Sequence, residues 1–154
     1  MRLPLVWRPA PSRGIAPAVV TAPVGLIDLA PTFCDVAGLP TPEWMQGARL
    51  PLDDDDAATR GVEQQLTAWD SELFGVAVHL RTITRDGWVC TAYLPGAVHD
   101  GTEGELYSLV DDPLQKVNRW DDPAVRALRD DLLAQLRDSQ PPDRASRLEL
   151  QAPV

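Results

Sequence analysis

The sequence is poor in the residues that build metal centres, basic surfaces and membrane spans. Its 154 residues include one lysine, two cysteines and two histidines. Cys34 and Cys90 form no CxxC pair. Neither His79 nor His99 has a second ligand at zinc spacing, so no zinc site is expected. No run approaches the roughly 20 apolar residues of a transmembrane helix, so no membrane partner is expected either.

Positive charge is scarce and unevenly distributed. Residues 1–52 carry four arginines against three acidic residues, a net charge of +1, whereas residues 53–154 carry ten basic and twenty acidic residues, a net charge of −10. An acidic surface repels phosphate backbones, and no basic patch is interleaved with aromatic residues. We therefore expect no nucleic-acid partner.

What the sequence does contain is enough apolar material for one globular domain. It is 44% hydrophobic, and its fifteen prolines and ten glycines predict many loops and short elements. We expect an irregular mixture of helices and strands, in the α+β or α/β class. Residues 1–4 lack the pattern of a signal or transit peptide, so a cytoplasmic product is expected if Met1 is the true start.

Two apolar stretches near the N-terminus predict strands. Residues 3–7, LPLVW, form a short continuous run that suits a strand buried on both faces of a larger sheet. Residues 18–27 suggest one or two further strands, broken by Pro23 and Gly25.

The next segment carries start and stop signals for a helix at residues 28–38. Asp28 is an acidic cap, a proline lies in the first turn, and Gly38 ends the helix. Its apolar face is expected to comprise Leu29, Phe33 and Val36. Residues 40–59, which include the acidic run 53–56, are predicted as loop because prolines prevent the helix from resuming.

The second half of the chain predicts an antiparallel meander. Val76, Val78 and Leu80 alternate with polar residues, and Asp86-Gly87 separates this strand from a second at residues 88–94. A third short strand is expected at residues 105–109.

An amphipathic helix is expected to follow the meander. Asp122-Pro123 provides its cap, and the polar, proline-bearing segment after Ser139 is predicted as a loose tail. The apolar stripe of this helix comprises Val125, Leu128, Leu132, Leu133 and Leu136.

In this order, the segments resemble the C-terminal portion of sulfatases of the alkaline-phosphatase-like superfamily. The resemblance is carried by RLPLVWRP (2–9), LIDLAPTFCDVAGLPTPEWMQGARLPL (26–52), HLRTITRDGW (79–88) and GELYSLVDDPLQKVNRWDDP (104–123). Ser108 departs from it, because the family commonly has an acid there, and Val89-Cys90 replaces a usual basic residue.

The resemblance implies a division of the chain into three parts. Residues 1–60 would be the end of the large α/β sulfatase domain. Residues 61–138 would be a C-terminal subdomain with a small antiparallel sheet and a C-terminal helix, and residues 139–154 the tail.

For chemistry, the resemblance implies mostly that the catalytic residues of the family are absent from this chain. Family sulfatases use a formylglycine made from the Cys or Ser of a C/S-x-P-x-R motif, and a divalent cation, usually calcium, held by Asp and Asn. Cys34 is followed by Asp-Val-Ala and Cys90 by Thr-Ala-Tyr, so neither fits that motif. Sulfate ester hydrolysis also needs converging positive charge and an activated nucleophile. We expect no catalytic residue, metal or cofactor in this chain.

His79 and Arg81 are the candidate substrate-binding residues. They alternate with apolar residues, so we expect them to face away from the core and, in a complete enzyme, to line the substrate cleft. Packing at the surface or between domains is the competing interpretation.

Two other candidate sites are weighed against simpler interpretations. The acidic run 53–56 offers carboxylates to Ca²⁺, but adjacent carboxylates diverge along a chain and a solvated loop is favoured. Ser71, His79 and Asp70 offer the residue types of a hydrolytic triad, but no nucleophile elbow surrounds the serine. A loop followed by a strand is favoured there.

The leading hypothesis is a truncated sulfatase, a C-terminal fragment that is inactive alone and pairs with an N-terminal sulfatase half or another protein subunit. The alternative is a non-catalytic scaffold or binding module that packs on a partner protein. A small independent esterase is a third hypothesis, for which no activated nucleophile is visible. Resemblance of fold does not decide between sulfate esters and phosphonate or phosphate monoesters as the parent substrate.

Overall fold

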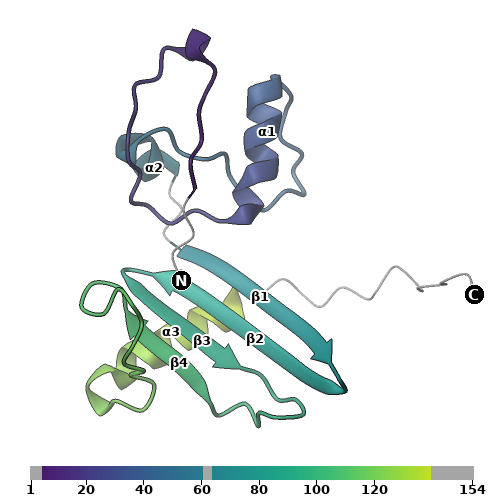
Figure 1. Cartoon of the computed structure of the whole chain (residues 1–154), viewed down its shortest axis with the longest axis vertical. Coiled ribbons are helices and arrows are strands. Elements are labelled where there is room, and N and C mark those ends of the chain that lie inside the picture. The colour runs from purple at the N-terminus through teal and green to yellow at the C-terminus, as the bar shows by residue number, and fades with distance from the viewer. Residues whose placement is uncertain (1–4, 61–63, 140–154) are drawn as a thin grey trace, which may run out of the picture.

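The computed structural model describes residues 5–60 and 64–139, which form two lobes (Figure 1). The N-terminal lobe contains η1 (Pro11–Arg13), η2 (Leu26–Asp28), α1 (Leu29–Ala37) and α2 (Asp54–Arg60). The C-terminal lobe contains β1 (Gln64–Leu73), β2 (Val76–Arg85), β3 (Trp88–Tyr93), β4 (Gly104–Ser108), η3 (Pro123–Val125) and α3 (Arg126–Asp138). This mixture of helices with a small antiparallel sheet confirms the expected fold class.

The sheet is a four-stranded antiparallel meander with the order β1-β2-β3-β4. The turn between β2 and β3 is Asp86-Gly87, as predicted, with φ of 50° and 76°. The β1–β2 turn, Phe74-Gly75, likewise has φ of 53° and 78°. Positive φ at both central residues is the requirement of a type I′ hairpin turn, and glycine adopts it without a Cβ penalty. β1 itself was not predicted.

The core lies between one face of this sheet and α3. It is formed by Ile83, Cys90, Leu106, Trp120, Leu132 and Leu136, and Val125, Leu128 and Leu133 pack against it. The predicted apolar stripe of α3 is therefore confirmed, as is the cap, since Asp122 Oδ1 accepts a hydrogen bond from Ala124 N at 2.9 Å. Each large apolar side chain buried here contributes about 1.5–3 kcal/mol to stability.

The N-terminal lobe is organised around Asp28. The predicted helix is confirmed as α1, with Gly38 at its end in the left-handed conformation, φ 68°. The Asp28 carboxylate does not cap α1 but accepts backbone hydrogen bonds from Gly25 N at 2.9 Å and Ala48 N at 3.0 Å. It also pairs with Arg60 at 3.3 Å. One buried carboxylate thus ties together three segments of the lobe: the start of η2, the segment at Ala48, and α2.

The predicted strands at residues 3–7 and 18–27 do not form in the described residues. Residues 5–7 and 18–25 have no regular structure, η2 begins at Leu26, and residues 3 and 4 lie outside the described ranges. Val6 is 91% exposed. An apolar run becomes a strand only where a neighbouring strand satisfies its backbone hydrogen bonds, and none of the described strands pairs with these segments.

The loop predicted at residues 40–59 is also partly wrong, because Asp54–Arg60 forms α2. Asp53 Oδ1 accepts a hydrogen bond from Asp56 N at 2.8 Å, which is the geometry of an N-cap. Three acidic residues in the first turn interact favourably with the positive end of the helix dipole. The predicted loose tail lies, beyond Ser139, outside the described residues.

Candidate functional site

The candidate residues His79 and Arg81 lie on β2 and share one carboxylate on β1. Asp70 is the cross-strand partner of His79. Its Oδ1 atom lies 2.8 Å from His79 Nδ1 and 2.8 Å from Arg81 Nη1. The Asp70–His79–Arg81 cluster is therefore the main charged grouping on the hairpin formed by β1 and β2.

The face on which this cluster lies differs from the prediction. Side chains alternate along a strand, so His79 and Arg81 share a face with Ile83, which is fully buried. Arg85, on the same face, contacts Gln135 and Asp131 of α3. The cluster thus lies on the helix-covered face, nearer to the Phe74-Gly75 turn, and the expectation that it faces away from the core is wrong. The aliphatic Val78 and Leu80 point the other way.

The triad considered from the sequence is not assembled. Asp70 and His79 are in contact, but Ser71 follows Asp70 on β1 and therefore points to the opposite face. Its Oγ accepts a hydrogen bond from Trp69 Nε1 at 3.0 Å. Ser71 and the imidazole cannot exchange a proton directly, so these residues do not form a serine nucleophile with its base. The loop expected before β2 is also wrong, because β1 occupies it.

The cluster can present hydrogen-bond donors to an anionic oxygen. Hydrogen bonds from Arg81, and then from His79, lower the pKa of Asp70, so its carboxylate stays ionised. The bond at Nδ1 orients the imidazole and leaves Nε2 for a ligand. His79 is 38% exposed and Arg81 17%, so both remain accessible to an incoming group.

Neither cysteine has the surroundings of an activated nucleophile. Cys90 is fully buried in the core, and burial raises the pKa of its thiol to about 11. Thiolates are the nucleophilic form, so this sulfur is inert at neutral pH. Cys34 is free and partly exposed on α1.

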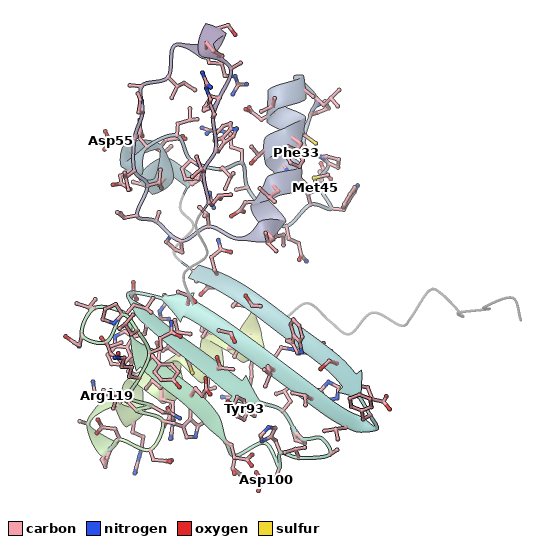
Figure 2. The ribbon with its side chains drawn as sticks, viewed as in Figure 1. Phe33, Met45, Asp55, Tyr93, Asp100 and Arg119 are labelled. Atoms are coloured by element: carbon pink, nitrogen blue, oxygen red, sulfur yellow. The ribbon has the colours of Figure 1, made fainter. Side chains whose placement is uncertain are left out.

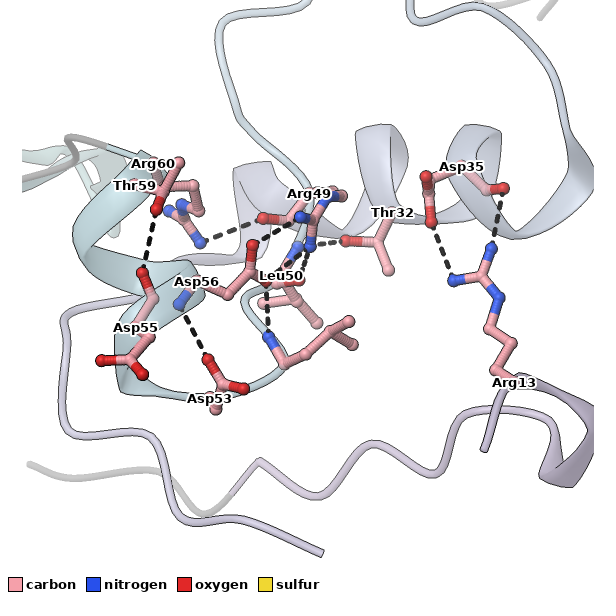
Figure 3. A network of polar contacts seen from close by, with 11 residues as sticks. Arg13, Thr32, Asp35, Arg49, Leu50, Asp53, Asp55, Asp56, Thr59 and Arg60 are labelled. Carbon is pink, nitrogen blue, oxygen red and sulfur yellow. Dashed lines mark hydrogen bonds and ion pairs between the residues drawn. The ribbon is translucent and has the colours of Figure 1, made fainter. Parts of the chain in front are cut away.

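The acidic run 53–56 is absorbed into helix capping and ion pairs rather than left as a solvated loop (Figure 3). Asp54 Oδ1 accepts from Thr21 N at 2.9 Å. Asp56 holds Arg49 through two hydrogen bonds of 2.7 and 2.5 Å. Asp53, Asp54 and Asp56 thus contact different partners. Among residues 5–60 and 64–139, no three His, Cys, Asp or Glu side chains gather where they could hold a metal ion.

One polar network was missed from the sequence. Tyr93 OH donates to Glu105 Oε1 at 2.5 Å, and the Thr82 and Thr91 hydroxyls lie 2.9 Å apart. These four residues lie on the face of the sheet opposite α3. The signal was the alternation of hydroxyl-bearing and apolar residues in β3 and β4, which predicts a strand with one polar face.

None of the described helices has the length and apolar character needed to cross a bilayer.

The arrangement of meander and covering helix is that of the C-terminal portion of sulfatases. A protein of Bacteroides thetaiotaomicron classed as a sulfatase is 28% identical, with a TM-score of 0.51, over 78% of this chain and 27% of its own. A 2-O GAG sulfatase is 29% identical, with a TM-score of 0.54, over 72% of this chain and 25% of its own. The phosphonate monoester hydrolase of Agrobacterium radiobacter shares the fold at 20% identity, with a TM-score of 0.54, over 72% of this chain and 24% of its own.

The family model for the C-terminal region of N-sulphoglucosamine sulphohydrolase matches residues 1–141, and the chain belongs to this family. The predicted sulfatase resemblance is thereby confirmed. The chain spans about a quarter of the length of the solved structures that it matches. Among curated proteins, no significant match is found.

Proposed function

We propose that this chain is the C-terminal part of a sulfuric ester hydrolase and supports a catalytic half that it does not itself contain. The observation that carries the proposal is the family match over residues 1–141, together with the coverage of only about a quarter of each related structure. The remaining three quarters of those structures have no counterpart here. We place the reacting groups in that remainder.

Alone, the chain is proposed to be inactive. A sulfate ester is attacked only when positive charge and an activated nucleophile converge on it. The Cys90 thiol is buried with a raised pKa, and Ser71 points away from the His79 imidazole. Neither cysteine stands in a C/S-x-P-x-R motif. We propose that the catalytic half supplies the formylglycine and the divalent cation that the resemblance implies, since no three His, Cys, Asp or Glu side chains of the described residues gather where they could hold a metal ion.

The proposed partner, an N-terminal sulfatase half, is favoured by an exposed apolar patch on the N-terminal lobe. This patch comprises Phe33, Val36, Leu39 and Trp44, whose exposed fractions are 66%, 55%, 61% and 73%. Figure 2 shows Phe33 and Met45 on the same flank of α1. Exposed apolar side chains that gather on one part of a surface mark an interaction site. Here Phe33 and Val36 lie on α1, whose other side is buried at Pro31 and Thr32, and Leu39 and Trp44 follow it.

In the complete enzyme, we propose that His79 and Arg81 line the substrate cleft. Arg81 carries a permanent positive charge, and the orientation of His79 by Asp70 leaves Nε2 available to an anionic oxygen. The ligand class is a sulfated compound. Asp70 acts as a positioning residue for both.

The test is reconstitution. The chain is purified alone and together with the polypeptide that carries the C/S-x-P-x-R motif in the same gene or in the neighbouring one. Turnover of a chromogenic aryl sulfate is then measured. We expect activity only with both parts. Activity from the chain alone contradicts the proposal, and stable assembly of the two parts without any activity favours the scaffold alternative.

A further inference from the structure

The sheet has a second face that α3 does not cover. We define the open face by Trp69, Leu80, Thr82, Thr91, Tyr93, Glu105 and Tyr107, which alternate with the residues that contact α3. In Figure 1, α3 lies behind the sheet, and no other described element lies over the front. Figure 2 shows Tyr93 on this front face.

A phenol and carboxylate cluster lies on β3 and β4, at the β4 edge of the open face. Tyr93 OH donates to Glu105 Oε1 at 2.5 Å, and Tyr107 lies two residues further along β4 on the same face. Burial, and then the hydrogen bond to Glu105, raises the pKa of Tyr93 to about 12. Burial and the negative charge of Glu105 also raise the pKa of Tyr107. Both phenols therefore stay protonated, and each phenolic oxygen keeps lone pairs that accept hydrogen bonds.

The cluster carries negative charge without a cation. Among the described ranges, no Lys, Arg or His lies within ion-pair distance of Glu105, although it is half-buried. The charge of Asp112 also acts on Tyr107. Residues 53–154, which include the whole sheet, carry a net charge of −10. Such a surface attracts a cationic group and repels an anionic one, so a sulfated ligand does not suit it.

We propose that the open face is a docking surface for a protein that inserts an arginine side chain against Tyr93, Glu105 and Tyr107. A guanidinium has five donors in a planar fork, which match the carboxylate and phenolic oxygens of the cluster. It also stacks on aromatic rings, and the Tyr93 and His99 rings lie 4.5 Å apart at the edge of the cluster. That this protein is the catalytic half rests on the proposed function.

The two faces of the sheet differ in the charged groups that they carry. The helix-covered face carries the Asp70–His79–Arg81 cluster, in which Asp70 accepts from two cationic or protonatable groups. The open face offers acceptors and an uncompensated carboxylate. An anionic substrate suits the first and a basic protein surface suits the second.

The experiment is co-purification of this chain with the motif-bearing polypeptide defined above, using Glu105→Arg and, as the matched control, Glu72→Arg. Glu72 is exposed on the opposite face of β1, so the control makes the same charge change away from the cluster. We expect Glu105→Arg to weaken assembly about tenfold or more and Glu72→Arg to leave it unchanged. Tyr93→Phe, which keeps the ring, should weaken it less. Assembly of Glu105→Arg at the wild-type level, with circular dichroism showing a folded variant, overturns the proposal.

A second measurement tests the chemistry on the chain alone. The ring NMR signals of Tyr93 and Tyr107 are followed during titration with N-acetylarginine amide and, separately, with glucosamine 6-sulfate. We expect shifts only with the arginine compound. Shifts only with the sulfated sugar would overturn the docking proposal in favour of a substrate site. Aryl sulfatase activity of the chain alone contradicts the proposed function but leaves this face unaffected, so the two failures are distinguishable.

Discussion

The Asp28 carboxylate and the Arg60 guanidinium form an ion pair at 3.3 Å, with side chains only 2% and 7% exposed. Asp28 also receives the two backbone hydrogen bonds from Gly25 and Ala48. A buried charge that loses its partner keeps its desolvation cost, so removing one member of such a pair is strongly destabilising.

Asp28→Asn should therefore lower the free energy of unfolding by about 3 kcal/mol. Urea denaturation followed by circular dichroism measures the change. The matched control is Asp35→Asn, because Asp35 pairs with Arg13 on the surface, where the side chains are 38% and 36% exposed. That change should cost less than about 1 kcal/mol. Equal losses in both variants would show that burial does not set the strength of the Asp28 pair.

Gly104 is predicted to tolerate no side chain. A Cβ atom there would lie 2.5 Å from the Thr91 carbonyl oxygen and even closer to the Trp120 ring. Gly104→Ala should cost about 1–3 kcal/mol, because a core ring and backbone must move. Gly25→Ala serves as control, since its Cβ would meet the flexible Gln65 side chain at 2.5 Å, which can turn away. Thermal unfolding of both variants, with a smaller loss expected at Gly25, checks this.

Acid should weaken the N-terminal lobe through Asp56. The hydrogen bonds from Arg49 lower the pKa of Asp56 below its value in the unfolded chain, about 3.9. Its stabilising contribution is therefore present above that value and is lost as the pH falls through the lower, folded pKa. Asp56→Asn should reduce stability at pH 7 and flatten the decline below about pH 4.

Urea unfolding at several pH values between 7 and 3 measures this effect. Asp55→Asn is the control, because the Asp55 side chain makes no hydrogen bond or ion pair within the part of the chain that the structure describes. An unchanged pH profile in Asp56→Asn would exclude Asp56 as a source of the acid sensitivity.

The two cysteines should react at very different rates. Cys90 is fully buried with its pKa raised to about 11, whereas Cys34 is partly exposed. With Ellman's reagent at pH 8, one thiol should react promptly in the native chain and the second only after denaturant is added. The Cys34→Ser variant identifies which is which. Prompt reaction of that variant would show that the core opens readily around Cys90.

Sequence patterns predicted the C-terminal lobe well where the signals were local. Asp86-Gly87 and Asp122-Pro123 fix a turn and a cap through their own backbone preferences, and the leucine stripe of α3 needed only one packing surface. β1 was missed because QQLTAWDSEL has few β-branched residues. Its strand conformation comes from pairing with β2 over its whole length, which is a tertiary effect.

The candidate site was harder to predict because it depends on that missed strand. The contact between Asp70 and His79 exists only in the register of β1 against β2. The face was misassigned for a related reason. Both faces of β2 carry apolar residues, so the alternation alone does not identify which face is buried. Packing of α3 on Ile83 selects the face that includes His79 and Arg81. The apolar runs near the N-terminus indicated segments that tend to be buried. Composition alone cannot identify the element that packs over them.

The meander order of the sheet has a consequence for how the chain folds. Every strand pairs with its neighbour in sequence, so hairpins close short loops and pay little loop entropy. The Asp28–Arg60 contact, in comparison, must bring together residues 32 positions apart. The hairpins of the sheet should therefore form first. Kinetic measurements should assign the slower steps to the N-terminal lobe and to the docking of α3, whose contact with Arg85 spans 50 positions.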